Sequence, residues 1–210
     1  GIFEEDHPIV KYINQVVANL IRHPNVATYW QKPPKIYVLK EDKESTGFAL
    51  PDGTIVLSLK MLDLVQTEDE LAFLLSHEMI HIQHKHAEET LQKLRSGQMW
   101  VKEYLGSPRL HEYEADLTPV VTMLSQAGYH PLAGSTFFES LKKTFPDSWS
   151  EQHGGLEDRR LNILSLRYIL DLQGIRHIQR PVDPEWKERL SQELANIPKD
   201  THFGERKKRL

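Results

Sequence analysis

The chain has 210 residues, of which 39% are hydrophobic and 27% are charged, a composition typical of globular proteins. The formal net charge of −4 argues against a dedicated nucleic-acid binder. The chain contains no cysteine, so a thiolate zinc site, a disulfide scaffold and a cysteine nucleophile are all excluded. Any zinc ion must therefore be bound by His, Asp or Glu side chains.

The first part of the chain predicts one helix and then short strands. In chain order, the expected elements are a helix over residues 9–21, a strand over residues 35–40, and a hairpin that joins residues 48–50 to residues 54–58. Asp6 is the expected N-cap of the helix, and Pro24 should end it. The turn of the hairpin is Pro51-Asp52-Gly53.

Only helices are predicted after residue 66. Thr67 and Glu70 form a capping box, which predicts one long helix from about Glu68 into the region of Arg95. Further helices are expected over residues 111–127, with a kink at Pro119 and Gly128 as the C′ residue, and over residues 131–145, 156–172 and 184–195. This order predicts an α+β fold, with a small antiparallel sheet beside a mainly helical body.

The segment His77-Glu78-Met79-Ile80-His81 is an HExxH motif inside the predicted long helix. A step of four residues turns a helix by about 400°, so the two imidazoles share one face and can bind one ion. Glu78 lies about 100° further round, where its carboxylate can take a proton from a metal-bound water. Three such side chains on an apolar, half-buried face are costly without partners, which favours a metal site over a chance match.

A catalytic zinc ion usually has three protein ligands and a water, so a third ligand must come from elsewhere in the chain. Glu112 and Asp116 are one turn apart on the next predicted helix. We assign Glu112 as the third ligand and Asp116 as the acceptor of the other ring N–H of a zinc histidine. Glu114, about 160° away from Glu112 around the helix, is expected to be solvated. The alternative is an acidic first turn that only complements the helix dipole.

These motifs resemble peptidase family M48 of the gluzincin metallopeptidases, over roughly residues 45–165. The other matching segments are Phe48 to Ile55 (A-x-P-G-G-x-I type), Glu68 to Ala72 (D-E-L-A), Lys85-His86 (R-H), Arg109 to Glu112 (S-R-x-x-E), Ala127 to Pro131 (A-G-Y-D-P), and His153 with Arg159 (H-P-x-x-x-x-R). Departures from the family pattern occur at Ile80, Lys85, Pro108 and Gly154, and they leave pocket shape and substrate preference open.

The resemblance implies a zincin-like fold and a zinc endopeptidase in which Glu78 is the general base. It implies one Zn²⁺ per chain, held by His77, His81 and Glu112. His153 and Arg159 are the candidates to stabilise the oxyanion. His153 has an alternative role as a fourth zinc ligand in a latent form, and Arg159 has the alternative of an ion pair with Glu157 or Asp158.

We expect a single peptidase domain over residues 1–210, with the motif core at about 45–165 and a helical extension at about 175–210. The resemblance implies a polypeptide substrate, unfolded or misassembled, and we expect no nucleic-acid partner. No apolar run is long enough to span a bilayer. The chain therefore resembles the soluble, exported bacterial members of the family, which act in the periplasm or cell envelope. Peripheral or lipid-anchored membrane association through residues preceding Gly1 is left open, as is the oligomeric state.

Three interpretations remain in competition. The first is an active peptidase, and the second is a non-enzymatic binding module with structural zinc, which would have no need of Glu78. The third is metal buffering by the run His77 to His86, which leaves Glu112 and Asp116 unexplained. His84 and His86 lie just beyond the motif, and we expect them to face solvent. Residues 54–58 are either an edge strand that a peptide could join or plain sheet core.

Overall fold

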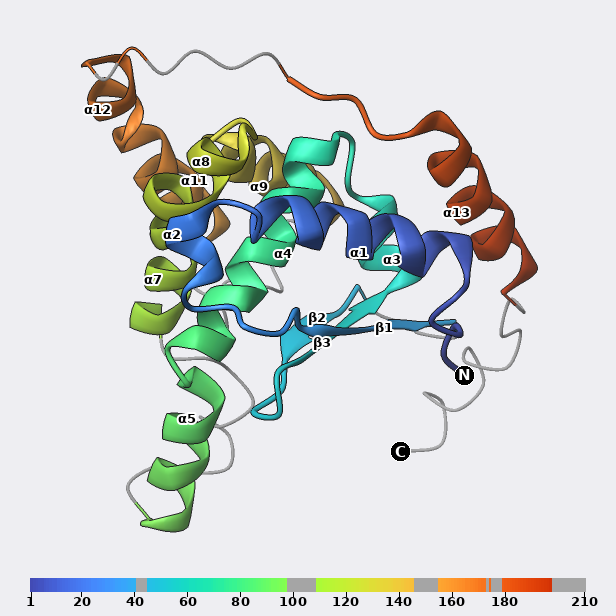
Figure 1. Ribbon diagram of the computed structural model, residues 1–210, viewed down its shortest axis with the longest axis horizontal. Coiled ribbons are helices and arrows are strands. Elements are labelled where there is room, and N and C mark those ends of the chain that lie inside the picture. The colour runs from blue at the N-terminus through green and yellow to red at the C-terminus, as the bar shows by residue number, and fades with distance from the viewer. Residues whose placement is uncertain (41–44, 98–108, 146–154, 173, 175–178, 198–210) are drawn as a thin grey trace, which may run out of the picture.

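The computed structural model describes residues 1–40, 45–97, 109–145, 155–172, 174 and 179–197, and Figure 1 shows its helices gathered around a small sheet. The first helix, α1 (Pro8–Leu20), buries one apolar face that includes Ile9, Ile13 and Leu20. Its N-cap is His7, whose Nδ1 accepts a hydrogen bond from the amide of Ile9, so the expectation that Asp6 caps this helix is wrong. A second short helix, α2 (Pro24–Ala27), follows at once.

The sheet has three strands in the order β1-β3-β2. They are β1 (Lys35–Leu39), β2 (Gly47–Ala49) and β3 (Thr54–Ser58). The predicted hairpin is confirmed, because β2 and β3 pair antiparallel around Gly53, which has a φ of 86°. The expectation of an all-antiparallel sheet is wrong, since β1 pairs parallel with β3. After β1, the chain forms β2 at the opposite edge of the sheet. The hairpin then places β3 between the two, and β3 runs in the same direction as β1.

Strand position decides between the two interpretations of residues 54–58. All five residues of β3 are buried, so this strand is sheet core. Within the described part of the chain, β1 and β2 are the edge strands, and β2 is the one against which α4 packs. The surface that a peptide could join is therefore β2 and not β3.

The helix that carries the HExxH motif is α4 (Glu68–Gln83), and it follows the short helix α3 (Leu59–Asp63). The predicted cap is present, because the amide of Glu70 donates to the Thr67 hydroxyl at 3.2 Å. The expectation of one helix into the region of Arg95 is wrong. Lys85 adopts a left-handed conformation with a φ of 58°, which ends the helical hydrogen-bond ladder, and the chain restarts as α5 (His86–Arg95).

The later helices keep the predicted order with local differences. Pro119 ends α7 (Arg109–Pro119), and the chain continues through a π-helical segment, Val120–Leu124, into α8 (Ser125–Ala127). Gly128 caps it with a φ of 74°, as predicted. The remaining helices are α9 (Ala133–Thr144), α11 (Leu156–Ser165), α12 (Arg167–Leu172) and α13 (Pro184–Asn196), so the predicted helix over 156–172 is interrupted at Leu166.

Helix α4 lies in the middle of the molecule and contacts α1, α7, α9 and two strands of the sheet. At one of these contacts α9 approaches α4 at Gly134, where a Cβ atom would lie 2.4 Å from the ring of Phe73. None of the described helices is both long enough and apolar enough to cross a membrane. The architecture is α+β, with a mainly helical body and a small mixed sheet, and it is compatible with a zincin-like fold.

Candidate metal centre

Helix α4 presents His77 and His81 from successive turns of one face, as the motif predicts. Their Nε2 atoms lie 3.1 Å apart, and the two rings meet edge to face at 72°. Only 9% and 10% of the two side chains are exposed. Burial, followed by the neighbouring His77, lowers the pKa of His81 to about 2, so this ring is neutral at physiological pH.

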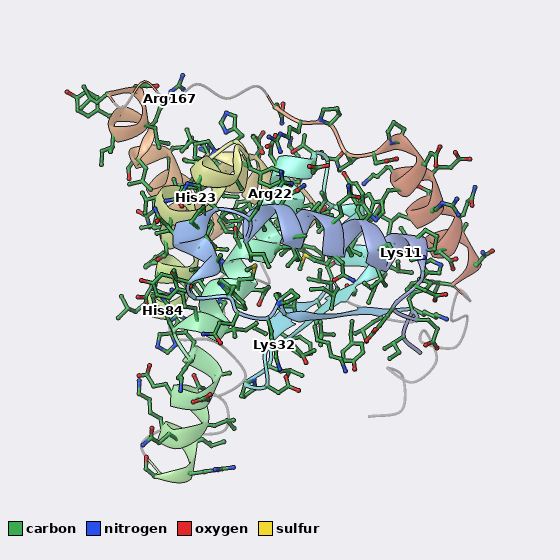
Figure 2. The ribbon with its side chains drawn as sticks, in the orientation of Figure 1. Lys11, Arg22, His23, Lys32, His84 and Arg167 are labelled. Carbon is green, nitrogen blue, oxygen red and sulfur yellow. The ribbon has the colours of Figure 1, made fainter. Side chains whose placement is uncertain are left out.

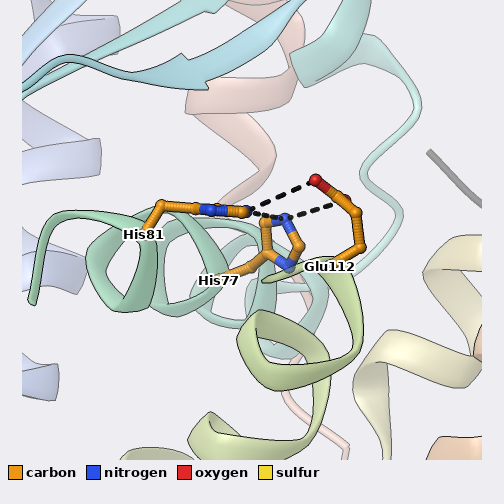
Figure 3. Close-up of side chains that lie close together, drawn as sticks. All are labelled: His77, His81 and Glu112. Carbon is orange, nitrogen blue, oxygen red and sulfur yellow. Dashed lines mark hydrogen bonds and ion pairs between the residues drawn. The ribbon is translucent and has the colours of Figure 1, made fainter. Parts of the chain in front are cut away.

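Helix α7 crosses α4 and places Glu112 opposite the two rings (Figure 3). One carboxylate oxygen lies 3.7 Å from Nε2 of His77, and the other lies 3.7 Å from Nε2 of His81. Tetrahedral zinc with ligands at about 2.0–2.1 Å separates neighbouring ligand atoms by about 3.3 Å. The three side chains therefore fit a zinc ion. Its positive charge would also offset the repulsion between the two nitrogen lone pairs and the carboxylate.

Asp116 lies one turn beyond Glu112 and is fully buried. Its Oδ1 is 3.0 Å from Nδ1 of His77. A carboxylate here favours the tautomer with the proton on Nδ1, which leaves the Nε2 lone pair facing the centre. The pKa of His77 is raised, because the lowering effect of burial is outweighed by Asp116, Glu112 and Glu78.

Arg159 on α11 connects the two carboxylates of α7. It donates from Nε and from a terminal nitrogen to Asp116, both at 2.7 Å, and lies 2.9 Å from Glu112. Only 2% of Arg159 is exposed. Its pKa is raised above the usual value, since Asp116 and then Glu112 outweigh the effect of burial. Its contact with a reacting carbonyl stays a prediction.

Of the two alternative partners considered for Arg159, Glu157 and Asp158, the first has ion pairs of its own. Glu157 binds Arg160 at 2.6 Å and Lys142 at 2.9 Å near the surface. The other oxyanion candidate, His153, lies outside the described residues. Its two proposed roles, as an oxyanion donor and as a fourth zinc ligand, therefore stay predictions.

Glu78 is buried and lines the same pocket of about 200 Å³ as the three candidate ligands. One wall of this pocket is apolar and includes Phe73, Phe137, Phe138 and Leu141. Its rim is formed by β2, from Gly47 to Ala49. At Gly47 the backbone runs so close that an added Cβ would lie 3.7 Å from an oxygen of Glu78. A candidate base, a candidate metal site and a strand edge thus meet in one cleft.

One residue of this centre was assigned the wrong environment from the sequence, and a second has contacts that the sequence did not predict. His86, expected to face solvent, is buried, and its Nδ1 lies 2.9 Å from Nδ1 of His81. Glu114 remains 40% exposed, but its carboxylate contacts both His84 and His86. These contacts depend on the break between α4 and α5 at Lys85. The helical periodicity of the sequence does not predict this break. The spacing of His84 and His86, directly after a metal-binding motif, was the sequence signal that could have predicted these contacts.

Part of the chain matches a known protein family. Residues 10–105 match the family described as peptidase family M48, and no curated protein matches the chain. The matched segment contains α1 from Val10 onward, the sheet and the HExxH helix α4. Glu112 and Arg159 lie beyond it. The match supports membership in family M48, whose zinc-dependent members are metallopeptidases that hydrolyse polypeptides.

Proposed function

With membership in peptidase family M48 as the premise, we propose that this protein is a zinc-dependent endopeptidase that cleaves unfolded or misassembled proteins. The observation that carries the proposal is the convergence of His77, His81 and Glu112. Their ligand atoms all lie within 4.8 Å of one another, and Glu78 lines the same pocket. A structural zinc site would have no need of a carboxylate in the position of Glu78, which argues against the non-enzymatic binding module.

The side chains of this pocket have distinct roles in peptide hydrolysis. A zinc ion held there would polarise the scissile carbonyl and acidify a water molecule. Glu78 takes a proton from the attacking water and then delivers it to the leaving amine nitrogen as the C–N bond breaks. Asp116 orients the ring of His77, and Arg159 holds Asp116 and Glu112 in place. The apolar wall limits the access of bulk water to these groups.

The edge strand supports the proposed substrate class. β2 is an edge strand among the described residues, so its outer backbone edge can accept an extended peptide, and Phe48 on this strand is 40% exposed. A side chain of that peptide would enter the apolar part of the pocket beside Phe137 and Phe138. Folded proteins keep extended backbone and apolar side chains covered, whereas unfolded or misassembled chains expose both. Action in the bacterial periplasm or cell envelope is part of the proposal and is supported by the resemblance to exported members of the family.

The proposal is tested by zinc content and casein cleavage in the wild type and in Glu78→Gln. We expect both proteins to bind one zinc ion per chain and only the wild type to cleave. Glu88→Gln is the matched control, because Glu88 is an exposed glutamate on α5 whose partner is Lys85. It should cleave at the wild-type rate. Cleavage that survives Glu78→Gln would contradict the assignment of the base, and zinc that survives Glu112→Ala would contradict the third ligand.

A further inference from the structure

A chain of hydrogen-bonding side chains leads away from the candidate metal centre on the side of His81. From Nδ1 of His81 it runs 2.9 Å to Nδ1 of His86, and from Nε2 of His86 it runs 3.1 Å to the carboxylate of Glu114. Glu114 also contacts Nδ1 of His84 at 2.8 Å. Figure 2 shows His84 where α4 gives way to α5. The chain thus joins α4, α5 and α7.

The positions of the protons on these side chains follow from the carboxylate of Glu114, which ends the chain of hydrogen bonds. An ionised carboxylate only accepts hydrogen bonds, so the proton of a neutral His86 ring lies on Nε2, facing Glu114. Nδ1 of His86 is then an acceptor, and the close contact with His81 requires the proton of that ring on its Nδ1. Nε2 of His81 consequently keeps its lone pair, and this lone pair faces His77 and Glu112.

The ring of His86 is held firmly in this position. It stacks on His111 with a centroid distance of 4.0 Å and an interplanar angle of 2°. His111 is itself anchored to Glu89 at 3.0 Å, and both histidines are buried. The left-handed conformation of Lys85 brings His86 back towards His81 instead of continuing α4. The position of the ring is therefore set by several elements at once.

We propose that His86 is a positioning residue for the metal centre, which fixes the tautomer and orientation of His81 and is itself aligned by Glu114. The inference rests on the proposed zinc site. It assigns a separate orienting partner to each histidine ligand, since His77 faces Asp116 and His81 faces His86. A ligand ring that is aligned before the metal arrives loses less entropy on binding, so its partner raises metal affinity.

A second metal ion on His84, His86 and Glu114 is the competing interpretation, because their ligand atoms also lie within 4.8 Å of one another. An ion there would need the Nε2 lone pair of His86. The proton of His86 would then move to Nδ1, where it would meet the proton of His81. The two roles therefore exclude each other in one molecule, and zinc stoichiometry separates them.

The test measures zinc affinity by competition with a chromogenic chelator. His86→Phe keeps a ring to stack on His111 but removes both nitrogens, and zinc binding should weaken about 10- to 100-fold. His86→Asn restores an acceptor near the former Nδ1 and should recover much of the loss. His84→Ala is the matched control, because it removes the other partner of Glu114 and leaves the contact between His86 and His81; its affinity should stay within about twofold of the wild type.

Nitrogen-detected NMR of the histidine rings gives a readout that a merely structural role would not move. The zinc-free wild type should show His81 protonated on Nδ1, and His86→Phe should show a mixture of tautomers. Unchanged affinity and an unchanged tautomer in His86→Phe would overturn the inference. Two zinc ions per chain, with one lost in His84→Ala, would overturn it in favour of the second metal site. Zinc affinity unaffected by Glu112→Ala would instead refute the zinc site itself.

Discussion

Arg159 offers the sharpest test of the energetics of this centre. Its guanidinium binds Asp116 through two nitrogens at 2.7 Å and lies 2.9 Å from Glu112, and it is almost fully buried. In the metal-free protein, Arg159→Leu leaves both carboxylates buried without this cation. Breaking a buried ion pair from one side costs about 3–5 kcal/mol. We expect a loss of this size in the free energy of unfolding.

Equilibrium unfolding in urea, followed by circular dichroism in the presence of a chelator, measures this loss. With saturating zinc the loss should be smaller, because the ion supplies positive charge beside Glu112. The free energy of unfolding of Arg159→Lys should lie between those of the wild type and Arg159→Leu, since a lysine keeps the charge but cannot bind Asp116 through two nitrogens in one plane.

Arg160→Leu is the control for this experiment. Arg160 follows Arg159 in α11 and binds the half-exposed Glu157, so its removal should cost far less stability than the removal of Arg159. A chelator-treated Arg159→Leu protein within about 1 kcal/mol of the wild type would refute the reasoning, because two buried carboxylates that lose their shared cation should be destabilised by more than that. Equal losses in the two leucine variants would refute it as well.

Three further predictions concern packing, metal and protons. Gly134→Ala should cost about 1–3 kcal/mol in urea unfolding, because its Cβ would lie 2.4 Å from Phe73; a loss below about 0.5 kcal/mol would show that α9 shifts freely. Free zinc at about 100 times its dissociation constant should stabilise the wild type by about 2.7 kcal/mol over the chelator-treated protein, whereas the melting temperature of Glu112→Ala should not respond. The pKa of His77 is raised, so the metal-free protein holds its proton to higher pH and zinc must displace it. Calorimetry in buffers of different ionisation enthalpy should therefore show the release of about one proton from this ring near pH 6, where a ring with a raised pKa is protonated, and the absence of proton release at that pH would contradict the assignment.

Much of the centre follows from local sequence pattern. The one-turn spacing of His77 and His81 is a property of any α-helix, and the capping box at Thr67 predicts where that helix begins. The same spacing on the next predicted helix singles out Glu112 and Asp116, and the structure places Glu112 beside both histidines and Asp116 beside His77. The hairpin around Gly53 is equally local, since a turn needs only neighbouring residues.

Other features were decided by tertiary structure, because they join segments far apart in the sequence. The parallel pairing of β1 with β3 depends on which strand reaches the sheet edge first, and no periodicity records that order. The partners of Arg159 lie on another helix, whereas the alternative considered from the sequence was an ion pair with its neighbours Glu157 or Asp158. The break at Lys85 turns His86 from an apparent surface residue into a buried neighbour of His81. The sequence thus determined the candidate ligands themselves, through short-range helical geometry, and the folded structure determined what holds each ligand in place, through packing between helices.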